Sequence, residues 1–233
     1  MKGTERARKL KRIVGWTMAL LLLFALPAGA EPTETTPYNW YFQKNDSHRQ
    51  PELDANLSFL EDYDCVYLNK GTSEKVLYLT FDAGYENGNV EKILDALKKH
   101  NAQGAFFVLE HLVKCNTPLV RRMAEEGHLV CNHTAKHPDM SRITDKTLFC
   151  KQLSALEKVY ADCTGREMAP FYRPPEGRFS TQNLRSLNSE FIKVSLSMTA
   201  RGFTFFMFFL SFFTVGTILI PTVNLVFLPP FSF

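Results

Sequence analysis

Short apolar runs alternate with segments of helical periodicity over the middle of the chain. The runs are rich in β-branched and aromatic residues and have the length of buried strands. They are expected to form strands at residues 75–81, 104–108, 128–131 and 171–172. Between them, apolar residues recur every three or four positions, which is the spacing of one face of an α-helix. These helices are expected at residues 89–100, 117–126, 145–160 and 181–187.

Local signals support the helices and indicate the fold class. The apolar face of the first helix consists of Val90, Ile93, Leu94 and Leu97. The second helix begins with Thr117 as its N-cap and Pro118 in the first turn, and it ends before Gly127. Repeated strand–helix units predict an α/β fold, with a parallel sheet that is either open or closed into a barrel and has helices outside.

Three polar clusters fall at the ends of expected strands. Asp82 follows the first strand, His133 the third and Arg173 the fourth. In parallel α/β folds, chemistry takes place at the carboxyl ends of the strands, which meet at one edge of the sheet. The sequence therefore predicts an active site built from these three clusters.

The first 30 residues have the pattern of a secretory signal peptide. Six basic residues crowd the first dozen positions, an apolar run follows at 13–26, and Ala28 and Ala30 match the cleavage pattern. An uncleaved N-terminal anchor is the alternative, and both interpretations put the rest of the chain outside the cytoplasm. Without this segment, 21 of the 27 basic and 23 of the 24 acidic residues remain, so the net charge is −2 instead of +3. This balance excludes an electrostatic surface for nucleic acid.

The five cysteines form no Cys-x-x-Cys pair, which argues against a structural zinc site. An odd number in an exported protein leaves at least one thiol unpaired. We expect most of the cysteines to be buried, where they would act as small apolar residues.

The first and third clusters each have a catalytic and a structural interpretation. The first is TFDAGYENG, in which Asp82 ends an apolar strand and the following glycines let the backbone turn sharply. By itself, Asp82 also fits an aspartate that caps a helix. The third is RPPEG, in which two prolines hold Arg173 extended, so that it can orient a carboxylate by paired hydrogen bonds. A rigid surface turn is the alternative.

The second cluster, NHTAKHP, suggests a metal site. His133 and His137 are four positions apart and can lie on one face of a helical turn, where two imidazoles can bind one ion. Pro138 would stop any helix directly after them. Such pairs also arise by chance on protein surfaces, so it is the position after a strand that favours the metal interpretation.

Together, the three clusters resemble the motifs of the polysaccharide deacetylase family, carbohydrate esterase family 4. The resemblance runs from about residue 38 to residue 188. TFDAGYENG, NHTAKHP and YRPPEGRFS are most similar to the branch of delta-lactam-biosynthetic de-N-acetylases, which act on muramic acid in spore cortex peptidoglycan. The resemblance implies a distorted (β/α) barrel and a metal-dependent amide hydrolysis on peptidoglycan glycan strands.

The resemblance also implies a role for each matched residue. Asp82 would be the general base, and Arg173 would orient it and keep it ionised. His133 and His137 would hold a divalent cation, zinc, that polarises the acetyl carbonyl. A backbone N–H near Tyr85 would help to stabilise the oxyanion. The residues on the substrate and oxyanion side would be Tyr85, Pro174 and Pro175.

The chain departs from the family pattern at two places. Ala83 stands where most of the family has a third metal ligand, an aspartate, although the muramic acid branch departs there too. A site of two histidines and water would bind its metal more weakly, and Glu86 is an alternative ligand. The family also has a later aspartate, tryptophan and general-acid histidine, but the last histidine here is His137 and the last tryptophan is Trp40. We therefore expect this chain to be inactive.

The C-terminal part has an unusual composition, because residues 202–233 lack charge and are rich in phenylalanine. Residues 203–220 are about as long as the shortest membrane-spanning helices, which would give membrane contact. Translation in a wrong frame after a frameshift near Ser189 is the favoured alternative, and it would leave the barrel incomplete. The expected organisation is a signal peptide at 1–30, a polar lead-in at 31–74, a partial deacetylase domain at 75–188 and this tail at 189–233.

The function expected from the sequence is removal of N-acetyl groups from peptidoglycan, foremost from N-acetylmuramic acid. A general peptidoglycan or chitin-type N-acetylglucosamine deacetylase is the alternative enzyme. A membrane-tethered, glycan-binding pseudoenzyme is the alternative from a different class.

Overall fold

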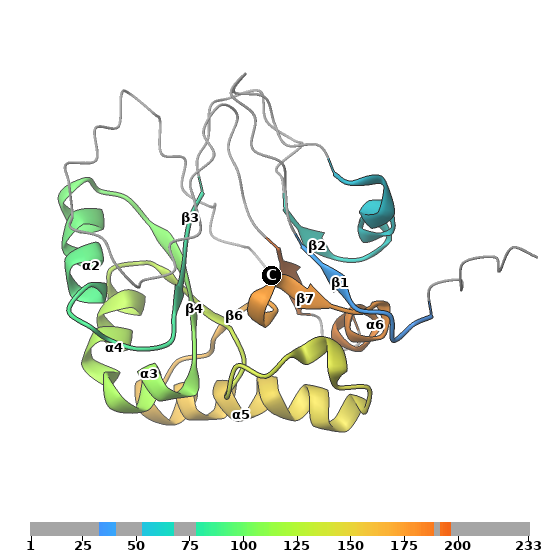
Figure 1. Cartoon of the computed structure of the whole chain (residues 1–233). Helices are drawn as coiled ribbons and strands as arrows, with labels where there is room; N and C mark the ends of the chain where they lie inside the picture. Colours follow the sequence, from blue (N-terminus) through green and yellow to red (C-terminus); the bar gives the residue numbers. More distant parts are fainter. Residues whose placement is uncertain (1–32, 41–52, 68–77, 189–191, 197–233) are drawn as a thin grey trace, which may run out of the picture. The chain divides into compact units, whose positions relative to one another are not determined.

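The computed structural model describes residues 33–40, 53–67, 78–188 and 192–196. Within them, a six-stranded parallel sheet has the strand order β2-β8-β6-β5-β4-β3 (Figure 1). Its strands are β2 (Cys65–Val66), β3 (Leu79–Ala83), β4 (Gly104–Val108), β5 (Leu129–Asn132), β6 (Ala169–Tyr172) and β8 (Lys193–Ser195). A separate antiparallel pair consists of β1 (Tyr38–Asn39) and β7 (Arg178–Phe179).

Five α-helices and three short 3₁₀ helices connect these strands in the described part of the chain. The α-helices are α2 (Val90–Lys99), α3 (Glu110–Cys115), α4 (Thr117–Glu125), α5 (Lys146–Thr164) and α6 (Thr181–Asn188). The 3₁₀ helices are η1 (Ala55–Asp62), η2 (Met140–Arg142) and η3 (Pro175–Gly177).

The order and direction of the strands confirm the α/β fold and the partial barrel. Strand β4 is buried along its whole length because both of its faces are covered. Phe106 and Val108 belong to the core beneath the helices. Ala105 and Phe107 alternate with them and pack into a second, smaller cluster on the opposite face. A strand that is covered on both faces has a continuous apolar sequence, which is why strand β4 could be predicted.

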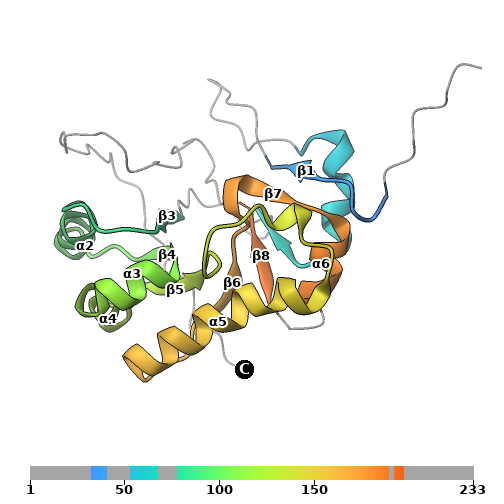
Figure 2. The same cartoon turned by 60° about the horizontal axis from the view of Figure 1, so that its bottom comes forward.

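The two longest helices form where their periodicity indicated. Val90, Leu94 and Leu97 of α2 are buried in the core, as predicted. Asp145 caps α5 by accepting a hydrogen bond from Leu148 N–H, and α5 ends at Gly165, which has a φ of 70°. Helix α5 packs against α3 and α4 at one end and α6 at the other (Figure 2).

Several boundaries differ from the predictions. Helix α3 was not predicted, because its six residues give too short a pattern. Thr117 is not the N-cap of α4, since Asn116 holds that position and the Thr117 hydroxyl donates to Val113 O at 2.7 Å. His128 lies outside β5, which extends through Asn132 instead.

The edges of the sheet also extend beyond the predicted elements. Strand β3 continues through Ala83, and residues 75–77 of the expected first strand lie outside the described residues. Strand β8 pairs with β2 and β6, so the sheet includes residues after position 188. Both β2 and β8 are too short to give a sequence pattern.

The described part of the lead-in packs onto the domain. Trp40 contacts Tyr67 with ring centroids 5.5 Å apart, whereas Tyr41 lies outside the described residues. The expected signal peptide and most of the expected tail also lie outside them. Among the residues that are described, no helix is both long and apolar enough to cross a membrane.

The expectation that most cysteines are buried is wrong. Only Cys131 is fully buried, Cys115 is exposed, and the other three are half-buried because they lie on an edge strand or on α5. Burial raises the pKa of Cys65 and of Cys131 to about 12, so both thiols stay protonated at neutral pH.

His128 is a buried ionisable group at the start of β5. Its Nδ1 accepts a hydrogen bond from Gly104 N–H at 3.2 Å, and its ring packs edge-on against Phe106. Burial lowers the pKa of His128 below its ordinary value of 6.5, because the charged ring would lose its contact with water. The folded protein therefore favours neutral His128.

Acid should destabilise the fold through His128. Above pH 6.5, the histidine is neutral in the folded and the unfolded chain. Below that pH the unfolded chain binds a proton that the folded chain excludes, so the free energy of unfolding falls. In urea unfolding between pH 7.5 and 5.5, His128→Gln should reduce this loss by at most about 1.4 kcal/mol per pH unit. His133 is also buried, but it is present in both proteins, so its contribution cancels. If the free energy of unfolding had the same pH dependence in the parent and in His128→Gln, the prediction would be wrong.

Candidate active site

The three polar clusters meet at one edge of the sheet. Asp82 lies in β3 near its carboxyl end, His133 directly follows β5, and Arg173 directly follows β6. The strands β3, β4, β5 and β6 are consecutive neighbours and parallel, so their carboxyl ends lie together. Asp82, His133 and Arg173 therefore lie at the edge that the strand ends indicated, and their roles in catalysis stay a prediction.

Arg173 is buried and makes the ion pair of the site. Its side chain is 4% exposed, and its Nη1 donates to Asp82 Oδ1 at 2.8 Å. Its Nε and Nη2 each lie 3.4 Å from Ser195, facing the carbonyl and the hydroxyl oxygen. The guanidinium carbon lies 4.0 Å from the centre of the Phe107 ring, a cation–π contact. Arg173 therefore holds the carboxylate by one hydrogen bond rather than by the expected pair.

The backbone after Arg173 is held in a tight turn. Pro174 and Pro175 are buried, and Glu176 and Gly177 both have left-handed φ values, 57° and 67°. A Cβ at position 177 would approach Trp40 O to 3.3 Å, so glycine fits this position best. This turn fixes the direction in which the chain leaves Arg173.

His133 and His137 lie together, but not on a helix. Their ring centroids are 5.0 Å apart with the planes at 73°. Thr134 and His137 have left-handed φ values of 77° and 56°, which no α-helix contains. The Thr134 hydroxyl accepts a hydrogen bond from His137 N–H at 2.9 Å and stabilises this loop. The expectation of a helical turn is wrong, because the loop reverses direction by left-handed residues.

The orientation of His133 suits a metal ligand. Its Nδ1 lies 2.9 Å from Arg173 O, and a carbonyl oxygen can only accept, so Nδ1 carries the proton. The lone pair is then on Nε2, the pattern typical of metal-bound histidine. Burial lowers the pKa of His133, which keeps the ring neutral as a ligand must be.

Asn132 organises the loop and had no role in the sequence interpretation. Its side chain accepts from Thr134 N–H at 2.9 Å and donates to Leu153 O and to Glu157 Oε1 on α5. Its backbone carbonyl accepts from Arg173 N–H at 3.0 Å. The amide therefore links β5, α5 and the segment after β6. Its burial, 1% exposed, was the missing information, since no sequence pattern marks a buried asparagine.

In the described part of the site, the two histidines are the side chains that could hold a metal ion. Among the described residues, no group of three or more His, Cys, Asp or Glu side chains could share an ion. Ala83 is buried in the core, and the carboxylate of Glu86 folds back onto Gly88 N–H. Two imidazoles with an oriented lone pair fit a weakly held divalent cation.

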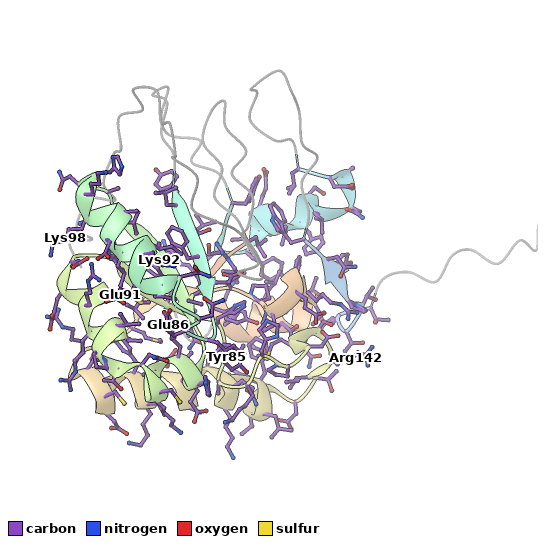
Figure 3. All side chains as sticks on the ribbon, turned by 60° about the vertical axis from the view of Figure 1, so that its left-hand side comes forward. Tyr85, Glu86, Glu91, Lys92, Lys98 and Arg142 are labelled. Carbon is purple, nitrogen blue, oxygen red and sulfur yellow. The ribbon has the colours of Figure 1, made fainter. Side chains whose placement is uncertain are left out.

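Tyr85 lies on the loop after β3, where Figure 3 labels it beside Glu86. Its side chain is 64% exposed and contacts the ring of His111 on α3, with centroids 4.6 Å apart. His111 had no role in the sequence interpretation, because nothing in the chain order relates it to Tyr85.

Removing Arg173 should destabilise the fold chiefly through Asp82. Arg173→Met leaves a carboxylate that is 19% exposed without its partner, and this should lower the free energy of unfolding by about 3 kcal/mol. In an Asp82→Asn background the loss should be at least 1 kcal/mol smaller, because a neutral amide needs no counter-charge. Urea unfolding of the four proteins measures this coupling. The exposed Arg142→Met is the control and should change stability by less than about 0.5 kcal/mol. Additive effects would show that the ion pair is not coupled.

Sequence comparison relates the chain to enzymes of cell-wall glycans. A family model described as polysaccharide deacetylase matches residues 69–192, more than half of the chain. The peptidoglycan-N-acetylmuramic acid deacetylase PdaA of Bacillus subtilis is 42% identical over 168 residues, covering 72% of this chain and 63% of the relative. A peptidoglycan-N-acetylglucosamine deacetylase of Bacillus cereus is 34% identical over 131 residues, covering 55% and 46%. The chain thus spans less than two thirds of each of these relatives.

A structural comparison agrees with the sequences. The structure of Bacillus subtilis PdaA, a family 4 carbohydrate esterase, matches with a TM-score of 0.65 at 37% identity, covering 69% of this chain and 68% of that one. Its fold, and the family match over residues 69–192, support the same assignment. The chain belongs to the polysaccharide deacetylase family, the family 4 carbohydrate esterases, whose members hydrolyse carbon–nitrogen bonds.

Proposed function

We propose that this chain acts on peptidoglycan as an N-acetylmuramic acid deacetylase, a metal-assisted hydrolase of the acetamido group. The observation that carries the proposal is the joint role of Arg173. Its guanidinium holds Asp82, and its backbone carbonyl orients His133. A base and a metal ligand are thereby fixed by one buried residue. The name of the relative that is 42% identical supports the muramic acid substrate.

His133 and His137 would hold the divalent cation, which we propose to be zinc. When bound, such a cation would polarise the acetyl carbonyl and lower the pKa of water in the site towards about 7. Two protein ligands give a weaker site than three. Imidazole nitrogen is a ligand that zinc prefers, and the Nδ1 contact of His133 to Arg173 O keeps Nε2 available.

Asp82 serves as the general base. Oδ1 of Asp82 accepts the hydrogen bond from Arg173, so Oδ2 is the oxygen that accepts the proton from water. The water oxygen then bonds to the acetyl carbon, the carbon–nitrogen bond breaks, and the sugar nitrogen takes the proton that Asp82 Oδ2 accepted as acetic acid leaves. A backbone N–H near Tyr85 stabilises the oxyanion, and Pro174 and Pro175 form a stiff wall on the substrate side.

Peptidoglycan lies outside the cytoplasm, which agrees with the secretory signal predicted at residues 1–30. The spore cortex as the site of action stays a prediction. The inactivity expected from the sequence, in which no histidine follows His137, also stays a prediction, and acetate release decides between it and the proposed activity. Membrane contact through residues 203–220 stays a prediction as well, because these residues lie outside the described ones.

Two other functions are alternatives, and the same experiments distinguish them from the proposed one. The relative from Bacillus cereus is named for N-acetylglucosamine, so a glucosamine deacetylase is the enzymatic alternative. A glycan-binding pseudoenzyme would use the same edge of the sheet without turnover.

Acetate release tests the proposed reaction. With zinc, the chain should release acetate from peptidoglycan glycan strands without stem peptides, at a rate above buffer. Asp82→Asn should lower that rate by at least about 100-fold, because general-base catalysis contributes about 10²–10⁴. The exposed Asp162→Asn is the matched control and should keep the rate. A chelator should abolish release, and added zinc should restore it.

Glycan binding without acetate release would favour the pseudoenzyme, and release from glucosamine residues alone would favour the alternative enzyme.

Zinc binding tests the ligand assignment without turnover. Calorimetric titration should show one zinc per chain. His133→Ala and His137→Ala should each weaken binding by more than about 100-fold, since even loss of an outer-shell partner costs about 10–100-fold. The exposed His100→Ala should bind zinc as the parent does. Unchanged affinity in either ligand variant would contradict the assignment.

A further inference from the structure

An exposed pair of rings lies beside the candidate active site. Tyr85 is the most exposed of the large hydrophobic residues in the described part of the chain, at 64%. Its ring lies 4.6 Å from that of His111 with the planes at 43°, so the two rings pack against each other. Tyrosine combines a flat apolar face with a polar tip, so an exposed ring beside the site is available to a ligand.

The chain path places this pair at the catalytic edge of the sheet. Tyr85 follows Asp82 by three residues, so their Cα atoms are at most about 11 Å apart. Ala83 is in register with Val108 on β4, and Leu109 N–H contacts Ala83 O at 3.4 Å. Helix α3 begins at the next residue, and it carries His111. Both rings therefore come from segments that leave the sheet beside the candidate base.

The two side chains suit an acidic sugar. The C–H groups on one face of a pyranose ring are weakly positive and pack on the negative face of an aromatic ring. Tyrosine offers this surface at small entropic cost, because only two side-chain angles must be fixed. The phenol can also donate or accept a hydrogen bond at the sugar hydroxyls.

His111 offers a hydrogen-bond donor beside that surface. Its Nδ1 lies 3.8 Å from Cys115 Sγ, one turn further along α3. When the thiol donates to Nδ1, the proton of the neutral ring is on Nε2, which then donates outward. Nearby Glu110 does not repel an anion at this place, because Lys114 and Lys136 both pair with it. A carboxylate is the partner that such a donor binds most strongly.

We propose that Tyr85 and His111 form a sugar-recognition pair at the rim of the active site. Tyr85 stacks on a pyranose ring of the glycan, and His111 donates to the lactyl carboxylate that distinguishes muramic acid from glucosamine. This inference rests on the proposed function and deepens it, because it assigns the choice between the two amino sugars to one residue. It is separate from the oxyanion role proposed for the backbone near Tyr85.

Binding of two glycans to the full chain tests the pair. The probes are a stem-peptide-free tetrasaccharide of alternating N-acetylglucosamine and N-acetylmuramic acid, and chitotetraose, which lacks the carboxylate. Calorimetry should show Tyr85→Ala binding both glycans about tenfold more weakly, whereas Tyr85→Phe keeps the ring and stays within about twofold. His111→Ala should bind only the muramic acid glycan about tenfold more weakly. Leu148→Ala, which removes another exposed apolar side chain, should bind both as the parent does.

The outcomes separate this proposal from the proposed function. If the parent binds and both alanine variants bind equally well, the pair has no role and the proposed function is unaffected. If His111→Ala weakens both glycans equally, the carboxylate contact is wrong. If the parent binds neither glycan, the proposed function and the pair both fail. Tyr85 and His111 are exposed, so unchanged urea midpoints in the variants would exclude loss of folding as the cause.

Discussion

The candidate site depends on one buried guanidinium. Arg173 is 3% exposed and would be costly to bury as a free charge. Asp82 neutralises it, Ser195 accepts hydrogen bonds from two more of its nitrogens, and Phe107 covers one face of its plane. The backbone carbonyl oxygen of the same residue accepts a hydrogen bond from His133. A change at Arg173 should therefore affect both the proposed base and the proposed metal ligand.

The parallel sheet makes this arrangement possible. Strands β3, β5 and β6 end at one edge, and β4 between them supplies Phe107 from its second buried face. Asn132 then fixes the histidine loop to α5 and to the start of the arginine turn. Residues with left-handed φ values occur in the histidine loop and in the turn after Arg173. Their backbone conformation is strained, and the surrounding contacts keep it in place. Strain of this kind is typical of sites whose side chains must be held in place before substrate binds.

The sequence predicted those features that depend on local pattern. Strand β4 has a continuous apolar run, and helix α2 has a clear apolar face. Asp82, His133 and Arg173 were placed together because parallel strands end at one edge. The histidine loop was misread as helical, since a spacing of four says nothing about left-handed backbone. Ser195 and Tyr85–His111 depend on contacts between distant segments, so no spacing along the chain indicates them.

The proposed function depends most on the contact between the Arg173 carbonyl oxygen and His133. This contact would orient the His133 ring so that His133 and His137 bind the same metal ion. Nitrogen-15 NMR of the histidine rings tests this directly, because protonated and unprotonated ring nitrogens have well-separated shifts. The account predicts that His133 carries its proton on Nδ1, and that zinc shifts Nε2 of His133 and a ring nitrogen of His137 together while His128 stays unchanged. A proton on Nε2 of His133, or zinc that leaves both rings unaffected, would contradict it.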